Sequence, residues 1–183
     1  YKTDHHWTSL GAFYTFSQVA EQMQIKTDVS SGFVSYPIST TFNGMLAAKS
    51  GCRMDVREDI YMYVPRDTDN DVVVNYVDEQ RKTASLYDSS KLKTRDQYAV
   101  FLGENTSVVD IKTVSESKRR LLLIKDSYAN SFVPFLTPYF REIVLVDPRY
   151  YSGTIEDIMD TYRISDVLYL YSGNTFFQDN NLK

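Results

Sequence analysis

The sequence predicts an α/β protein: a three-layer α/β/α sandwich around a mostly parallel, flavodoxin-like sheet. Apolar runs of strand length, such as residues 121–124 and 143–146, alternate with helical segments in the C-terminal half. Strands that are apolar along their whole length are typical of parallel sheets, because helices cover both faces of such a sheet. With 183 residues, of which 43% are hydrophobic, the chain has the size of one domain with its own core.

The first predicted element is a helix over residues 9–24, with Thr8 as its N-cap. Its apolar residues recur at spacings of three and four, which places them on one face. Strands are predicted over residues 60–64 and 72–77, separated by a turn-forming run. We interpret residues 60–96 as a β-rich insertion within a single domain over residues 1–183.

The C-terminal half is predicted as alternating strands and helices. A short strand over residues 97–102 ends at Gly103, and residues 108–111 pair nearby. The remaining elements follow in order: a strand at 119–124, a helix at 128–140 interrupted by two prolines, a strand at 142–146, a helix at 155–162 and a strand at 167–171.

Composition narrows the classes of function. The net charge of −4 argues against a nucleic-acid partner. No apolar run approaches the roughly 18 residues of a membrane-spanning helix, so no membrane insertion is expected. A single cysteine, Cys52, excludes an internal disulfide and a multi-cysteine metal site. Because the chain begins with Tyr1, we interpret it as a piece of a longer protein whose signal or anchor is removed.

Ser127 follows a buried strand and precedes a helix, at the sheet edge where open α/β folds bind ligands. Backbone N–H groups at the start of that helix can stabilise an oxyanion. The alternative is that Ser127 or Asp126 only caps the helix. Taken alone, this position favours the capping role.

The cluster Asp4-His5-His6-Trp7 holds the only two histidines of the chain. A serine hydroxyl needs a base to take its proton, and an acidic partner fixes the tautomer of that base. The alternatives are a structural Asp–His hydrogen bond or a metal site. Adjacent histidines in a strand point to opposite sides, which disfavours the metal site.

The segments TDHHWT, KDSYANSFVPFLTPYF, EIVLVDPRYY and DVLYLY together resemble the DHHW family of bacterial proteins. That family is similar to the SGNH hydrolases and to the alginate O-acetylation proteins, which share an Asp-x-His-Trp motif upstream of a Gly-Asp-Ser motif. The resemblance implies Asp4 as orienting acid, His6 as general base and Ser127 as nucleophile. His5 occupies the variable position x of the Asp-x-His-Trp motif. Lys125 stands where the Gly-Asp-Ser motif has glycine, so the turn must be made differently.

The resemblance also suggests the groups around the serine. SGNH enzymes hold the oxyanion with the serine N–H, a glycine N–H and an asparagine side chain, which implies Gly103 and Asn105. The alternative is an ordinary turn with special dihedral angles. Arg149 and Tyr128 are further candidates for substrate binding, although Arg149 could instead pair with Asp147 or Asp126. A further acidic run is interpreted as a solvated loop rather than a calcium site: Asp67, Asp69 and Asp71.

The implied function is a serine-dependent O-acetyl transferase or esterase that acts outside the cytoplasm on a bacterial polysaccharide. Its implied partners are the polysaccharide, an acyl donor and a membrane-bound O-acyltransferase, with no cofactor or metal. One alternative is a non-catalytic carbohydrate-binding or scaffold component, since 14% of the residues are aromatic. Another is a metal-dependent hydrolase built on the two histidines.

Overall fold

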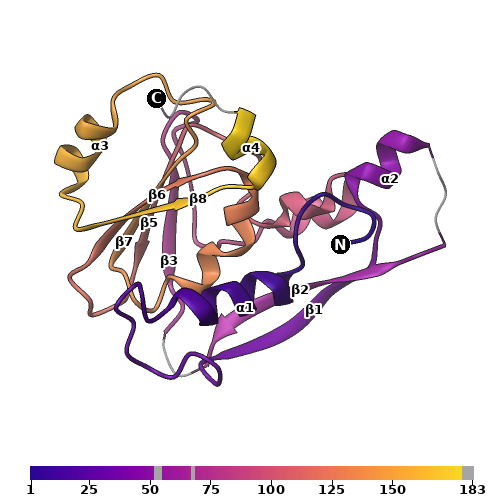
Figure 1. Ribbon diagram of the computed structural model, residues 1–183, viewed down its shortest axis with the longest axis horizontal. Helices are drawn as coiled ribbons and strands as arrows, with labels where there is room; N and C mark the ends of the chain where they lie inside the picture. The colour runs from indigo at the N-terminus through magenta and orange to yellow at the C-terminus, as the bar shows by residue number, and fades with distance from the viewer. Residues whose placement is uncertain (52–54, 67–68, 179–183) are drawn as a thin grey trace. The chain divides into compact units, whose positions relative to one another are not determined.

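The computed structural model describes residues 1–51, 55–66 and 69–178 (Figure 1). The chain divides into two compact units, each made of two stretches of sequence. Unit 1 comprises Tyr1–Thr68 and Tyr87–Glu104, and unit 2 comprises Asp69–Leu86 and Asn105–Lys183. Each unit has a cluster of buried apolar side chains. The single domain predicted over residues 1–183 stays a prediction.

Unit 1 is built around a two-stranded antiparallel ribbon, β1–β2. Buried aromatic side chains of this ribbon and of the second chain stretch, among them Phe42, Tyr98 and Phe101, form its core. The elements of unit 1 are α1 (Ser9–Val19), β1 (Phe33–Phe42), α2 (Met45–Ser50), β2 (Glu58–Pro65) and the 3₁₀ helices η1 (Ser89–Lys93) and η2 (Gln97–Val100).

Helix α1 confirms its predicted start, because the Thr8 hydroxyl accepts a hydrogen bond from the Gly11 N–H at 3.0 Å. It ends at Val19, five residues earlier than the pattern predicts. The Ile25 N–H donates to the Ala20 carbonyl and Gln24 takes φ 58°, so the chain turns back. Ala20 and Ile25 are buried at this turn, whereas Met23, the last apolar residue of the predicted helix, is half-buried.

Unit 2 contains a six-stranded sheet in the order β4-β3-β5-β7-β6-β8. Its central strands β5, β6 and β7 carry most of the buried aliphatic core, and α3 contributes Ile158. The elements are β3 (Val72–Tyr76), β4 (Arg81–Thr83), β5 (Val108–Thr113), β6 (Arg120–Lys125), η3 (Ser127–Ser131), η4 (Val133–Phe135), β7 (Glu142–Val146), α3 (Ile155–Tyr162), β8 (Asp166–Leu170) and α4 (Gly173–Gln178).

The sheet is mixed, which corrects the predicted mostly parallel sheet. Only β6–β7 and β6–β8 are parallel pairs, whereas the other three pairs are antiparallel. The four residues between β3 and β4 are too few for a parallel crossover, so the two strands form a hairpin. Residues 60–96, predicted as an insertion, are divided between the two units. The α/β class is confirmed, and the three-layer arrangement stays a prediction.

Two further predicted elements differ from the observed ones. Residues 97–102, predicted as a strand, form η2 and a single bridge between Tyr87 and Phe101. The helix predicted over residues 128–140 is replaced by the short 3₁₀ helices η3 and η4. Pro134 and Pro138 lack the N–H groups that a continuous α-helix needs, and a proline ring clashes with the preceding turn.

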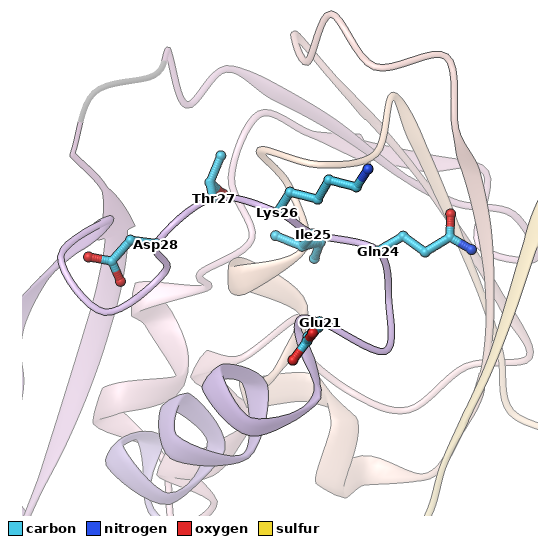
Figure 2. A pocket seen from close by; sticks show the side chains of 6 residues that line it. All are labelled: Glu21, Gln24, Ile25, Lys26, Thr27 and Asp28. Atoms are coloured by element: carbon cyan, nitrogen blue, oxygen red, sulfur yellow. The ribbon is translucent and has the colours of Figure 1, made fainter.

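A hollow of about 690 Å³ lies in unit 1 beside the turn that follows α1 (Figure 2). Its lining contains none of the predicted catalytic residues and consists of Glu21, Gln24, Ile25, Lys26, Thr27 and Asp28. Within the described ranges, no helix is long and apolar enough to cross a membrane.

Candidate active site

Asp4 and His6 form a buried hydrogen-bonded pair in unit 1. The Asp4 carboxylate oxygen Oδ1 lies 2.6 Å from His6 Nδ1 and also accepts the His6 backbone N–H at 3.0 Å. Because an ionised carboxylate can only accept, the proton of this contact belongs to Nδ1. Nε2 is then the nitrogen that can take up a proton, which is the state that a general base requires.

The Asp4 carboxylate is fixed from both sides. Its second oxygen accepts the Met45 N–H at 2.8 Å, at the start of α2. Burial by itself raises the pKa of Asp4, but the hydrogen bonds from His6 and Met45 outweigh it and hold this pKa well below its usual value. Asp4 therefore stays ionised at neutral pH, as the orienting acid of a triad must.

The backbone that carries Asp4 is anchored by two segments, β2 and residues 44–47. Glu58 of β2 accepts the Lys2 and Thr3 N–H groups and the Thr3 hydroxyl. The Thr3 carbonyl accepts two N–H groups of α2, and its hydroxyl accepts the Gly44 N–H. A side chain at Gly44 would have its Cβ 2.3 Å from the Asp4 Cβ. Only glycine allows this close approach.

The His6 ring contacts two other rings, one stacked and one tilted by 37°. It stacks on Tyr98 of η2 with centroids 3.6 Å apart and an interplanar angle of 6°. The His5 ring lies on it with centroids 3.9 Å apart. The expectation that adjacent histidines point to opposite sides is therefore wrong here, because residues 3–6 form a bend and not a strand.

Ser127 lies in unit 2, at the first position of η3 and two residues past the end of β6. Asp126 acts as the N-cap: its Oδ1 accepts the Tyr128 N–H at 2.9 Å, and its Oδ2 accepts the Ser172 N–H at 3.0 Å. The capping role thus belongs to Asp126 and not to Ser127. Ser127 and Tyr128 are both half-buried.

A family model described as "DHHW protein" matches residues 1–146, which include the Asp4-His5-His6-Trp7 cluster and Ser127. This chain belongs to the DHHW family. Trp7, the last residue of the motif that names the family, is half-buried just before α1. Arg149 lies beyond the matched residues.

Solved structures agree with the family assignment. A DHHW family protein from Eubacterium siraeum has a TM-score of 0.82 at 26% identity, over 98% of this chain and 60% of that one. PatB1 from Bacillus cereus, solved with a sulfonyl adduct, has a TM-score of 0.74 at 20% identity, over 96% of this chain and 60% of that one. A second PatB1 structure has a TM-score of 0.73 at 22% identity, with coverages of 96% and 62%. A comparison with curated proteins finds no match.

The present chain thus spans about 60% of the length of these solved proteins. The likeness to PatB1 concerns the fold.

Lys125, the departure from the Gly-Asp-Ser pattern, is buried at the end of β6. Its ammonium group donates to the Asn130 side-chain oxygen at 2.9 Å and so ties the strand end to η3. Burial lowers the pKa of Lys125 to about 8, although the charge of Asp147 opposes the shift. The turn before Ser127 is therefore made by a cross-link from a buried lysine instead of by a glycine.

Arg149 pairs with Asp147, the first alternative weighed for it. Its Nε and Nη2 donate to the two carboxylate oxygens at 2.9 and 2.6 Å, and this pairing raises the pKa of Arg149 above its usual value. About a third of the Arg149 side chain is exposed, so an edge of the guanidinium can still contact solvent. Its predicted role in substrate binding stays a prediction.

The two predicted oxyanion residues lie in different units, Gly103 in unit 1 and Asn105 in unit 2. Gly103 has φ 76° and its N–H donates to the Ala99 carbonyl at 2.9 Å, which fits the turn alternative. To bind an oxyanion, the Gly103 N–H would have to give up this bond. Asn105 is exposed. The oxyanion role of both residues stays a prediction.

Among the described residues, one group of three side chains could hold a metal ion. Asp4, His5 and His6 each offer a ligand atom, and these atoms lie within 4.8 Å of one another. Of the acidic run interpreted as a solvated loop, Asp67 lies outside the described residues, as does Cys52. Asp69 is exposed and accepts the backbone N–H of the likewise exposed Asp71.

Sequence reasoning missed the groups that support the pair. Tyr98 stacks on His6 although 92 positions separate them, and nothing in a sequence pattern links the two. Gly44 and Met45 also lie far from the motif, with 41 positions between Met45 and Asp4. A glycine directly before a short helix is the one visible signal, since such a position suits a close backbone approach.

Proposed function

We propose that this chain is a serine-dependent O-acyl transferase or esterase that acts on a bacterial cell-surface or secreted polysaccharide. Ser127 is the nucleophile, His6 the general base and Asp4 the acid that orients it. The observation that carries this proposal is the Asp4–His6 hydrogen bond, which gives His6 the tautomer of a triad base.

The reaction runs through an acyl-enzyme. His6 Nε2 takes the Ser127 proton as the serine oxygen attacks the acyl carbonyl. Backbone N–H groups at the start of η3, with Gly103 and Asn105 as further candidates, stabilise the oxyanion. The protonated His6 then gives its proton to the leaving group, and water or a sugar hydroxyl takes the acyl group from Ser127.

Two further points support acyl transfer. PatB1 shares its fold with this chain and has been solved with a sulfonyl adduct, and sulfonyl groups bond to activated nucleophiles. Ser127 follows the buried strand β6 by two residues, the kind of position at which α/β folds present reactive groups.

The proposed setting follows from the family resemblance. We place the protein outside the cytoplasm, with an acyl donor and a polysaccharide as substrates and a membrane-bound O-acyltransferase as a partner. Catalysis by this triad requires Ser127 of unit 2 to meet His6 of unit 1.

Hydrolysis of p-nitrophenyl acetate tests the proposal. We expect wild type to release nitrophenol with formation of an acetyl-enzyme, and Ser127→Ala to lose the activity by a factor of about 10³ or more. Ser152→Ala is the matched control, because Ser152 is an exposed serine of the same unit, and it should keep the wild-type rate.

Equal rates for wild type and Ser127→Ala would overturn the assignment. Glycan binding without any acyl-enzyme, retained by Ser127→Ala, would instead favour the non-catalytic carbohydrate-binding alternative. The exposed tyrosines would then be its candidate sugar-stacking residues, namely Tyr14, Tyr36, Tyr150 and Tyr169.

A further inference from the structure

We propose that Asp4, His5 and His6 form a binding site for a zinc ion, and that the bound ion inhibits the acyl transfer by occupying the base. The binding stands on the geometry of unit 1 alone. The inhibition rests on the proposed function.

The three ligand atoms already converge. His6 Nδ1 lies 2.6 Å and His5 Nδ1 lies 3.6 Å from the same Asp4 oxygen, Oδ1. Ligand atoms about 2.0–2.2 Å from a shared tetrahedral zinc lie roughly 3–3.5 Å from one another. To hold an ion, His6 Nδ1 and Asp4 Oδ1 must move apart from 2.6 Å, and the set of ligand atoms, which spans up to 4.8 Å, must contract, so the side chains have to reorient. The bend at residues 3–6 already brings the two imidazole rings together.

The donor set matches zinc chemically. Two imidazole nitrogens and one carboxylate oxygen are ligands that zinc favours, and three protein ligands leave a fourth position for water. Calcium and magnesium prefer oxygen ligands throughout, so they fit this set less well. Zinc is therefore the ion that this donor set fits best.

Two of the three ligands are held in place, and the third is open to solvent. Asp4 is fixed by the Met45 N–H, and His6 is fixed by its stacking on Tyr98. The His5 side chain is about half exposed, so an ion can approach from solvent. Lys49 and Asp96 act on His5, the first disfavouring and the second favouring a positive charge there.

Zinc in this position changes the state of the base. When Nδ1 of His6 binds the ion, its proton must leave, and in the neutral ring it moves through solvent to Nε2. The ring keeps one proton and no redox change occurs. A protonated Nε2 cannot accept the Ser127 proton, so nucleophilic attack stops. Removal of the ion restores the Nδ1–H tautomer through the hydrogen bond to Asp4.

Calorimetric titration of the purified chain with zinc chloride tests the site. We expect one equivalent to bind to wild type at pH 7.5, and His5→Gln to bind it at least about 100-fold more weakly. Asp96→Asn is the control, since it changes a charge near His5 without removing a ligand, and it should bind zinc within about threefold of wild type. A second titration uses wild type at pH 5, so that no substitution can disturb the fold. Histidine protonation should weaken zinc binding there at least tenfold.

The rate of p-nitrophenyl acetate hydrolysis, measured with and without zinc, tests the inhibition. Each protein is compared with its own zinc-free rate. We expect zinc to inhibit wild type, a chelator to restore the rate, and His5→Gln to need at least tenfold more zinc for the same loss.

Equal zinc affinities for wild type and His5→Gln, or no binding, would overturn the site. Tight zinc binding with an unchanged rate of hydrolysis would overturn the proposed inhibition but not the proposed zinc site. Tight, His5-dependent binding in a protein without any Ser127-dependent hydrolysis would support the site and count against the proposed function.

Discussion

At the scale of single residues, the geometry of the candidate site depends on one carboxylate, that of Asp4. Asp4 receives hydrogen bonds from the His6 ring, the His6 N–H and the Met45 N–H. Each of these favours the ionised form, and together they fix both the charge of Asp4 and the direction of the His6 ring. A polar network of this kind is held in place only if the backbone beneath it cannot shift.

Gly44→Ala tests that support. The new Cβ would lie 2.3 Å from the Asp4 Cβ and 2.7 Å from the Thr3 carbonyl oxygen, so backbone must move. We expect a loss of about 1–3 kcal/mol in the free energy of unfolding, measured with urea. We also expect a lower rate of acetyl ester hydrolysis, because Asp4 is displaced.

Gly173→Ala serves as the control, since a Cβ there meets nothing within 4 Å. Its stability should stay within about 0.5 kcal/mol of wild type. A stable, fully active Gly44→Ala variant would show that Asp4 does not need this packing.

The residues of the motif could be predicted from the sequence, but the residues that hold them in place could not. Asp4 and His6 are two positions apart, so any compact local backbone keeps them within reach, and their side chains are hydrogen-bonded in the structure; their catalytic role stays a prediction. Tyr98 and Gly44 contact the pair only through tertiary folding. The side-by-side rings of His5 and His6 could not be predicted, because they depend on a bend that the sequence does not mark.

At the scale of elements, the sheet of unit 2 carries a conflict of charge. Asp110 of β5 and Glu142 of β7 are both buried, and Asp110 Oδ1 has no hydrogen-bond partner among the described residues. Burial, and then the charge of Glu142, raise the pKa of Asp110 to about 6, although Lys112 and Lys82 oppose the shift. The folded state therefore prefers the protonated form of Asp110.

Asp110→Asn should remove a pH dependence of stability. The raised pKa means that the contribution of Asp110 is fully present below the ordinary value of 3.8 and is lost as pH rises through 6. We expect the variant to match wild type near pH 4 and to exceed it by roughly 1–3 kcal/mol at pH 8 in urea unfolding.

The control is Asp160→Asn, at an exposed carboxylate of α3, which should leave the pH profile unchanged. If Asp110→Asn keeps the wild-type profile, or is less stable at pH 8, the proposed charge conflict is wrong.

Several elements were predicted more closely than the order of the strands, and helix α3 has its predicted bounds of residues 155–162. β6, β7 and β8 lie within a residue or two of their predicted ranges, because long apolar runs with few polar breaks mark them clearly. The mixed sheet depends on which strands pair, and β5 joins β7 antiparallel through contacts far apart in sequence. The helix expected after Ser127 failed at its prolines, although the cap at Asp126 was foreseen as an alternative.

At the scale of the whole molecule, the two halves of the proposed triad belong to different units. Unit 1 carries Asp4 and His6, and unit 2 carries Ser127. The family match spans residues 1–146 and so includes both halves, which is why the sequence motifs could suggest a triad before any geometry was known. Activation of Ser127 by His6 is the central claim.

The rate at which a sulfonyl fluoride modifies Ser127, followed by mass spectrometry of the intact chain and its peptides, tests that claim most directly. We predict a single adduct on Ser127 of wild type and a rate lower by at least about 10² in His6→Gln, because the base is lost. Modification of Ser127 at the same rate in both proteins, or of another residue in wild type, would contradict activation of Ser127 by His6.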